Sequence, residues 1–362
     1  MHQLLHESLL SQSDNPQEDC PLFHVPGEIR DSIFSYVLTD HPDPSNQFSD
    51  KTCYTRPSWK ADQSTDTRLL RTCRAIYRET WFKPFLLREH TRWLSSPDRA
   101  PPSRHHPPPM SRMLKRIADQ QGTNNVEIER LRIFAQMYKL EDGELKRLLN
   151  SSYLAPRIVT LTIRHTDWWF WEDDEPLRFE ANWIKGVASV LSSSTNQLCI
   201  ELESLKRKKD QVDKIAAQMI KKWYFKRKDG VVLYAATTQQ SQWSGSSTWN
   251  NQRWVRDETE DGMLDYYIVT VTFLPKIEIE RKGGSVSDTA FNAAQQQGSF
   301  DEEKMKLHLP GQSRMEVARP YQTIHRVWDG RRHRRINPAS RFSDLDDVPI
   351  IPVRSASSGS QQ

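Results

Sequence analysis

The chain has 362 residues, which at about 150 residues per domain is enough for two folded units with room for tails. Hydrophobic residues make up only 36 % of it, below the roughly 45 to 50 % of globular chains, so part of the chain is not expected to pack. The net charge is +4, from 51 basic and 47 acidic residues. This near balance does not favour nucleic acid as the partner of the whole surface.

The cysteines and the apolar segments indicate an intracellular protein. The four cysteines form no C-x-x-C pair and are too few for a disulfide-stapled secreted domain. No apolar run approaches the roughly 18 residues that a membrane span needs, and residues 1–20 lack the features of a signal peptide. We therefore expect a flexible N-terminus over 1–20, no membrane contact, and a location in the cytoplasm or the nucleus.

A small helical unit is predicted over residues 21–94. Its first helix carries Ile29, Ile33 and Val37 at four-residue spacing, with Pro26 in a first turn that tolerates proline. Residues 39–66 then interrupt the unit with prolines, serines and aspartates, which predicts an exposed insertion.

The second helix of this unit is predicted over residues 67–82, where an apolar face lies opposite an arginine-lined one. We expect Pro84 to end it. Its apolar positions are Leu69, Leu70, Cys73, Ile76, Tyr77, Thr80 and Trp81.

Strands and helices alternate beyond a proline-rich segment, residues 95–109, which is predicted to be a stiff linker and domain boundary. An apolar-x-x-Leu-x-Ile pattern recurs, and it predicts three short strands at Ile128, Leu131 and Ile133, at Ile158, Leu161 and Ile163, and more loosely at Leu198, Ile200 and Leu202. Helical periods lie between these strands and again at 212–223, and further strands are predicted at 231–235 and 266–274.

This order predicts a mixed α+β or α/β protein. Residues 110–280 are expected to form an irregular βα domain of leucine-rich-repeat character with a mostly parallel sheet. Residues 281–362 turn to Gly, Ser, Gln, Arg and Asp, which predicts a disordered tail.

The first helix pair resembles the F-box-like segment at the start of many fungal proteins, which tend to continue with a strand-and-helix domain. The matching residues are Pro26, Glu28, Ile29, Ile33, Leu38, Cys73 and Arg74. Val25 stands where the family usually has leucine, and the 39–66 insertion splits a segment that normally runs almost without a break.

The resemblance implies docking to a Skp1-type adaptor of a cullin ubiquitin ligase, with the βα domain presenting an unknown protein substrate. It would place the adaptor contact at Pro26, Ile29, Ile33, Phe34 and Leu38. The alternative from the residues alone is that these side chains form the core of the first unit.

A tract of aromatic and acidic residues is the most unusual local feature. If residues 168–171 are extended, Trp169 and Trp171 share one side, which either packs in the core or anchors a partner. Trp243, Trp249 and Trp254 lie in a loop and are less easily assigned to a core. These five tryptophans are our candidates for a partner-binding surface.

The charged runs allow functional and structural interpretations. The carboxylates at 172–175 are expected to be a solvated edge, because four in a row stay hydrated and do not make an acid–base pair. The run at 206–209 is interpreted as the solvated start of a helix. A nuclear address, an anion contact or a solvated run are the alternatives for Arg331, Arg332, Arg334 and Arg335.

No reaction can be named from the motifs. The sequence contains no H-E-x-x-H, no zinc-like Cys and His spacing, no P-loop and no G-x-S-x-G. We therefore predict no metal, no cofactor and no enzyme activity; an enzyme would need a pocket that gathers His165, Asp167 and the 172–175 carboxylates. The leading hypothesis is a substrate-recognition subunit of a ubiquitin ligase, and the alternative is a non-catalytic intracellular or nuclear scaffold that does not bind the adaptor.

Overall fold

The computed structural model describes residues 2–11, 17, 19–102, 110–296 and 307. The chain divides into two units, residues 1–311 and 312–362, and all of the described residues lie in the first. The basic run at 331–335 and most of the predicted tail lie outside them.

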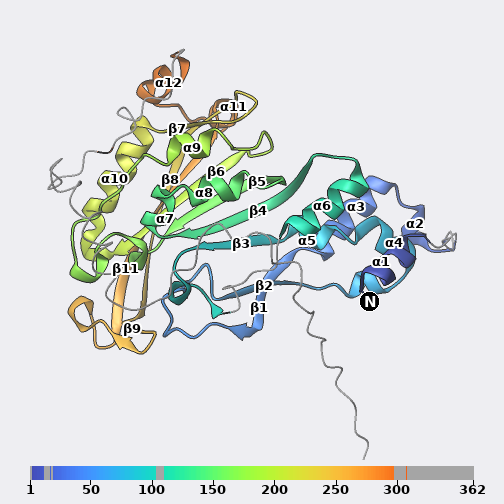
Figure 1. Cartoon of the computed structure of the whole chain (residues 1–362), viewed down its shortest axis with the longest axis horizontal. Helices are drawn as coiled ribbons and strands as arrows, with labels where there is room; N and C mark the ends of the chain where they lie inside the picture. Colours follow the sequence, from blue (N-terminus) through green and yellow to red (C-terminus); the bar gives the residue numbers. More distant parts are fainter. Residues whose placement is uncertain (1, 12–16, 18, 103–109, 297–306, 308–362) are drawn as a thin grey trace, which may run out of the picture. The chain divides into compact units, whose positions relative to one another are not determined.

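A seven-stranded sheet in the order β3-β4-β5-β6-β11-β8-β7 is the centre of the first unit (Figure 1). The first four strands of this order are parallel, and β11, β8 and β7 each pair antiparallel with their neighbours. The strands are β3 (Glu89–Leu94), β4 (Asn125–Ala135), β5 (Tyr153–Ile163), β6 (Gln197–Leu205), β7 (Tyr224–Lys226), β8 (Val232–Ser246) and β11 (Met263–Pro275).

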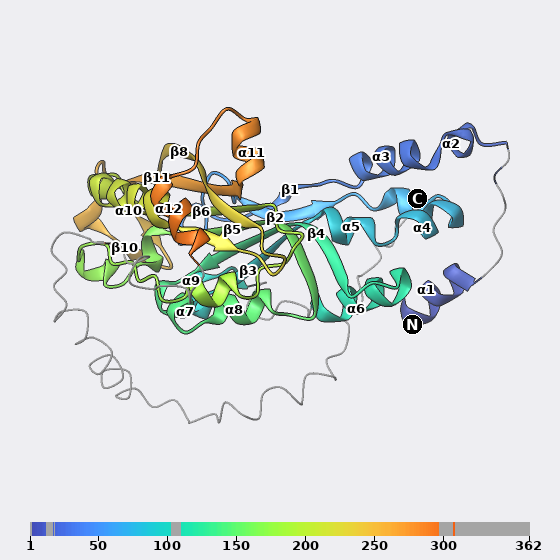
Figure 2. The same ribbon diagram turned by 90° about the horizontal axis from the view of Figure 1, so that it is seen from above.

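Helices bury one face of this sheet. Figure 2 shows α7, α8 and α9 on one side of the strands, and the hairpin of β1 (Asp40–Gln47) and β2 (Ala61–Thr65) on the other. The helices that follow the linker are α6 (Met110–Gln121), α7 (Met137–Glu141), α8 (Glu144–Leu149), α9 (Ile184–Ala188) and α10 (Lys209–Lys222). Their apolar faces join Leu131, Ile133, Leu161, Ile200 and Val271 of the strands in one core. The predicted mixed class is therefore confirmed.

The predicted strands of the second region are all present, but their arrangement differs from a repeat solenoid. β4, β5 and β6 are parallel neighbours, as the recurring pattern suggested. β11 then inserts antiparallel between β6 and β8. The apolar pattern fixes that a segment is a strand, whereas its direction depends on chain connections that the pattern does not contain.

The sheet also crosses the predicted linker. β3 lies before residues 95–109 and pairs with β4, which lies after them, over six residues. Within the described residues, the chain on both sides of the prolines therefore belongs to one folded unit. Prolines end a strand or helix locally, but they do not prevent the strands before and after them from pairing with each other.

The insertion at 39–66 is exposed along most of residues 41–50, as predicted, but it is a folded hairpin rather than an irregular segment. β1 (Asp40–Gln47) pairs antiparallel with β2 (Ala61–Thr65). Trp59 between them is 1 % exposed and packs edge-on against Phe134 of the sheet. Three aromatic residues in an otherwise polar segment, Phe48, Tyr54 and Trp59, were the signal that it packs.

The predicted flexible N-terminus contains a helix over residues 2–11, where His6 is 7 % exposed, lies 2.7 Å from the Tyr77 hydroxyl and packs on the Trp81 ring. Two further boundaries differ from the predictions. The second helix is a short 3-10 turn and α4 (Arg74–Thr80), and Pro84 lies in the first turn of α5 (Lys83–Leu87), where its missing N–H costs nothing. The predicted tail begins too early, because α11 (Lys276–Arg281) and α12 (Asp288–Gln295) pack against Tyr234 and Leu274 in a second small core. The remaining helices are α1 (His2–Ser11), α2 (Pro21–His24) and α3 (Gly27–Val37).

Candidate functional site

Helix α3 has two apolar sides, and only one of them is buried. Phe34 and Leu38 are at most 1 % exposed and belong to the core of the helical unit. Ion pairs fix this side: Arg30 donates to both carboxylate oxygens of Glu79 at 3.0 and 3.2 Å, and Lys83 pairs with Asp31 at 2.6 Å. α3 and α4 therefore lie side by side although a hairpin separates them in the sequence.

The other apolar side of α3 faces solvent. Ile29 is 52 % exposed, Ile33 41 %, Val37 44 % and Tyr36 86 %. At about 100° per residue these four positions and Pro26, which is also exposed, fall within one sector about 100° wide. We call these five residues the α3 face. A contiguous apolar surface of this kind marks a protein-binding site more often than scattered exposed residues do.

The five residues expected at an adaptor contact thus divide into two groups. Pro26, Ile29 and Ile33 are exposed on the α3 face. Phe34 and Leu38 are buried, so these two have the core role that was the alternative interpretation. The four-residue period alone could not separate the groups, because both sides of the helix carry apolar residues.

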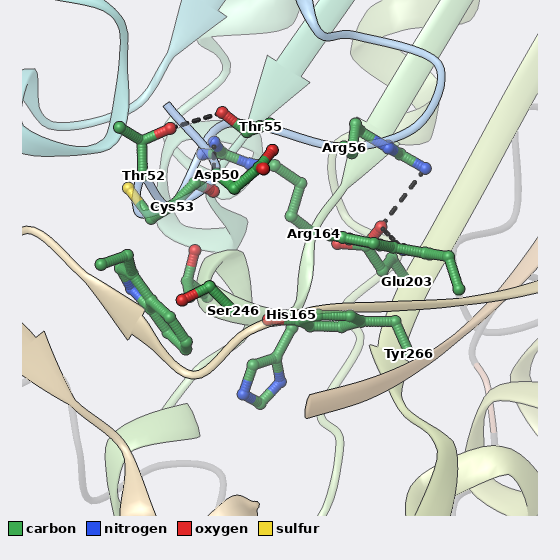
Figure 3. Close-up of a pocket in the computed structure, with 13 residues that line it drawn as sticks. Asp50, Thr52, Cys53, Thr55, Arg56, Arg164, His165, Glu203, Ser246 and Tyr266 are labelled. Atoms are coloured by element: carbon green, nitrogen blue, oxygen red, sulfur yellow. Dashed lines mark hydrogen bonds and ion pairs between the residues drawn. The ribbon is translucent and has the colours of Figure 1, made fainter. Parts of the chain in front are cut away.

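A small pocket lies at the carboxyl ends of β5 and β6. Figure 3 shows its residues, with Thr52 and Cys53 of the hairpin loop across the pocket from His165. Ligands often bind at this edge of parallel sheets. The pocket is lined by Asp50, Thr52, Cys53, Thr55, Arg56, Arg164, His165, Thr166, Glu203, Trp243, Ser246, Trp249 and Tyr266.

The cavity in this pocket holds about 20 Å³, which is room for one or two water molecules. Its two arginines are already paired with acidic groups. Arg164 donates to Asp167 at 2.6 and 2.9 Å, and Arg56 lies 3.3 Å from Glu201 and 3.4 Å from Glu203. The pocket as it stands therefore offers no unpaired guanidinium for an anionic substrate.

His165 is the most unusual group in the pocket. It is 3 % exposed, and neither ring nitrogen has a hydrogen-bond partner among the described residues. Burial lowers its pKa to about 3, so the imidazole is neutral near pH 7. Its ring contacts the rings of Trp171 and Tyr266 at centroid distances of 5.4 and 6.1 Å.

The pocket shows no activated nucleophile among its described residues. Burial raises the pKa of the Cys53 thiol, although Arg164 and Arg99 oppose the shift, so the thiol stays protonated and a poor nucleophile. Burial likewise raises the pKa of Tyr266 well above 10. Asp167 does not line the pocket and is bound to Arg164. The gathering of His165, Asp167 and the 172–175 carboxylates that an enzyme would need is not seen.

Side chains of the acidic run at 172–175 and of the basic run at 206–209 pair with each other, whereas both runs were predicted to be solvated. Arg207 bonds Asp174 and Asp257 at 2.6 Å each, and Lys208 lies 2.8 Å from Asp174. Glu172 is 3.3 Å from Arg99. The basic run at the start of α10 is thus held by the acidic loop, which offsets its unfavourable position at the helix start.

The five candidate tryptophans mostly fill the interior. Trp171 and Trp249 are 4 % exposed and make a cluster with the half-buried Trp254. Their burial corrects the prediction that Trp171 and Trp249 face a partner. The backbone at 168–171 is not extended, because Phe170 has a φ of 52°, so the expected alternation does not apply. Trp169, which is half-buried, donates to Glu141 at 2.7 Å.

The fifth tryptophan, Trp243, forms one wall of the pocket. Its ring stacks on Tyr266 at 4.4 Å and its indole N–H donates to Glu203 at 3.2 Å. Gly245 makes this position possible, since a Cβ there would lie 2.4 Å from the Trp243 ring. The sequence singled out Trp243 for a partner surface, not for a pocket, and it gave no signal for Cys53, Arg56 and Glu203, because they come from segments far apart in the chain.

Comparisons of the chain with protein-family models, with curated proteins and with solved structures give no match. Over the described residues, no group of three or more His, Cys, Asp or Glu side chains is placed to hold a metal ion. None of the helices within those residues is long and apolar enough to cross a membrane.

Proposed function

We propose that the chain is a protein-binding module that docks on a Skp1-type adaptor through the α3 face, as the substrate-recognition subunit of a ubiquitin ligase. The exposure of Ile29, Ile33, Tyr36 and Val37 on one side of a single helix carries this proposal. An amphipathic helix that lays its apolar side into a groove is a common mode of protein recognition. Such a role would place the protein in the cytoplasm or the nucleus.

The rigidity of α3 supports the proposal. Phe34 and Leu38 anchor the helix from the other side, and the Arg30–Glu79 and Lys83–Asp31 pairs hold it against α4 and α5. A helix held in this way loses little conformational entropy when a partner covers it. The helix pair of the F-box-like resemblance is also adjacent in space, so the 39–66 hairpin does not remove that support.

Co-expression with a fungal Skp1-type adaptor, followed by size-exclusion chromatography, tests the proposal. The test variant is Ile29→Glu with Ile33→Glu, which puts two carboxylates on the α3 face without touching the buried side. Ser32→Glu with Thr39→Glu is the matched control, because it adds the same two charges at exposed positions outside the α3 face. Wild type and the control should co-elute with the adaptor, and the test variant should not, while circular dichroism shows that all three fold.

Two results would contradict the proposal. One is that wild type at about 50 µM, far above the Kd of a specific complex, does not co-elute with the adaptor. The other is that the double glutamate variant binds as well as wild type. Either result would favour the scaffold hypothesis, in which the α3 face serves a partner of another kind.

A further inference from the structure

Strand β8 has an open outer edge. β11 pairs with β8 along its whole length, but on the other side β7 pairs only with Val232, Leu233 and Tyr234. Over the described chain, no strand pairs with the outer side of β8 between Ala235 and Ser246. Six consecutive residues there, Thr237–Gln242, are exposed, so neither face of this part of the strand is covered. Figure 1 shows β8 and β11 running together towards β9 (Thr248–Trp249).

This edge lacks the features that usually protect an exposed strand. Natural edge strands are kept from pairing by lysines, prolines, strong bulges or short length. Residues 235–246, with the sequence AATTQQSQWSGS, contain no charged residue and no proline, and their register with β11 is unbroken from Thr237 onwards. The opposite edge strand of the same sheet, β3, is six residues long and carries Glu89 and Arg92. Over the residues that the structure describes, no strand pairs with the backbone N–H and C=O groups that point away from β11 beyond Tyr234, so these groups can accept another strand.

We propose that the open edge of β8 pairs antiparallel with β8 of a second copy of this chain, so that two sheets join across a two-fold axis. The absence of charge on the edge favours a second copy, because two identical edges approach without like-charge repulsion. A two-fold arrangement also uses the same surface on both copies and leaves no open edge between them. This inference does not depend on the proposed adaptor contact, since it involves none of the α3 residues.

The geometry of antiparallel pairing limits the register. Along two antiparallel strands, hydrogen-bonded and non-hydrogen-bonded residue pairs alternate. A two-fold axis midway between two neighbouring pairs would make them equivalent, which this alternation forbids. The axis therefore passes through a pair in which a residue faces the same residue of the other copy. The centre of the exposed run lies between Gln239 and Gln240. An axis at Gln239 brings Thr237 opposite Ser241, and an axis at Gln240 brings Gln239 opposite Ser241. In both registers a glutamine faces its own copy, and uncharged hydrogen-bonding side chains surround that pair.

The contact should be weak. Two edges of about six residues bury less surface than the roughly 1,200 Å² at the lower limit of stable interfaces. We therefore expect a dimer that dissociates with a Kd of about 10 to 100 µM, which lies in the range of transient complexes.

Sedimentation of the full chain between about 2 and 200 µM, a range that brackets this Kd, tests the proposal. Wild type should shift from 42.4 kDa towards twice that mass. Gln239→Lys with Gln240→Lys should stay monomeric, because lysines then face each other across the axis, and Gln239→Glu with Gln240→Glu should do the same. A mixture of the two variants should dimerise again, because opposite charges now meet. A variant with Ile29→Glu should dimerise like wild type.

Each other result overturns the proposal. Wild type that stays monomeric at the highest concentration excludes the second copy and leaves the edge to a strand from a different protein. A wild-type dimer that both charged variants retain shows that another surface makes it. Charged variants that fail to regain the dimer when mixed, although each folds by circular dichroism, show that the edge does not face itself.

Discussion

The two faces of the central sheet are covered in different ways. On β6, Ile200 and Leu202 point towards the helices and are completely buried, whereas Glu201 and Glu203 point to the opposite face. There the hairpin insertion supplies Arg56, whose guanidinium lies within 3.4 Å of both carboxylates. One strand thus holds an apolar layer on one side and an ion-pair network on the other.

The network ties together segments that are distant in the sequence. Arg132 of β4 lies 3.1 Å from Glu201 and 2.8 Å from Glu89 of β3, and Thr162 of β5 donates to Glu201 at 2.7 Å. Burial opposes ionisation of Glu201, but Arg56 and Arg132 outweigh it and lower its pKa below the usual value. We call the sheet side covered by helices the helix face and the side covered by the 39–66 hairpin the hairpin face. The helix face should tolerate substitutions among apolar residues of similar volume, whereas the hairpin face requires particular charged partners.

Removing the centre of the network should have the largest effect. Glu201→Ala removes the carboxylate that Arg56 and Arg132 share and leaves them with Glu203 and Glu89, so we expect it to lower the free energy of unfolding by about 3 kcal/mol, the lower end of the cost of breaking a buried ion pair. Urea unfolding followed by tryptophan fluorescence measures this. Glu278→Ala, which removes an exposed i,i+3 pair with Arg281, is the control and should cost about 0.5 kcal/mol or less. If both variants lost the same free energy of unfolding, the buried ion-pair network would contribute no more than one exposed ion pair, which would contradict this prediction.

Acid should destabilise the protein through His165, at the end of the hairpin face. Its pKa is about 3 in the folded chain, against an ordinary value of 6.5 in the unfolded chain, so between these limits the unfolded state binds more protons. Stability therefore falls as the pH falls below 6.5, by about 2 to 3 kcal/mol at pH 4.5.

A comparison of His165→Gln with wild type separates the contribution of His165 from that of other groups. His90, whose burial lowers its pKa to about 4, titrates in a similar pH range, but it is present in both proteins and its effect cancels. The variant should lose less stability than wild type between pH 6.5 and about pH 4.5 in urea unfolding. Parallel pH profiles for the two proteins would show that His165 does not remain neutral when folded.

The apolar patterns predicted the helix face well and the hairpin face poorly. β4, β5, β6, β11 and the first residues of β8 were found from alternating or recurring apolar residues, because burial against helices leaves a local signal in the sequence. Residues 237–246, which include Trp243, were predicted to be a loop, but they continue β8 as an exposed strand without apolar alternation. The pocket and the ion-pair network leave no such signal. Arg56 and Glu201 are 145 positions apart, and a charged residue in a polar loop looks the same whether it is solvated or paired.

Glu141, on the helix side of the sheet, should respond to pH in the opposite direction from His165. Burial raises the pKa of this α7 carboxyl to about 7, although the hydrogen bond from Trp169 opposes the shift. Between pH 4.5 and 7 the folded state therefore binds more protons than the unfolded state, so this group's contribution to stability is lost as the pH rises through that range.

Glu141→Gln keeps an acceptor for the Trp169 indole and removes the titration. The variant should be more stable than wild type at about pH 8 by about 1 kcal/mol, after allowance for the partial exposure of the site, and the gain should vanish near pH 4.5. Thermal unfolding at the two pH values measures this. A constant difference between the two proteins at both values would mean that Glu141 ionises normally.

A small effect is also expected from a conservative change next to the network. Ile200→Val removes one methylene group from the helix face, while its neighbour Glu201 keeps every partner. The cost should be about 0.5 to 1.5 kcal/mol in urea unfolding, because packed apolar residues can adjust to a small change in volume. Since Ile200 and Glu201 are consecutive residues of β6, the ratio of their two effects compares the two faces directly. A loss at Ile200→Val as large as that at Glu201→Ala would mean that the helix face is as intolerant as the hairpin face.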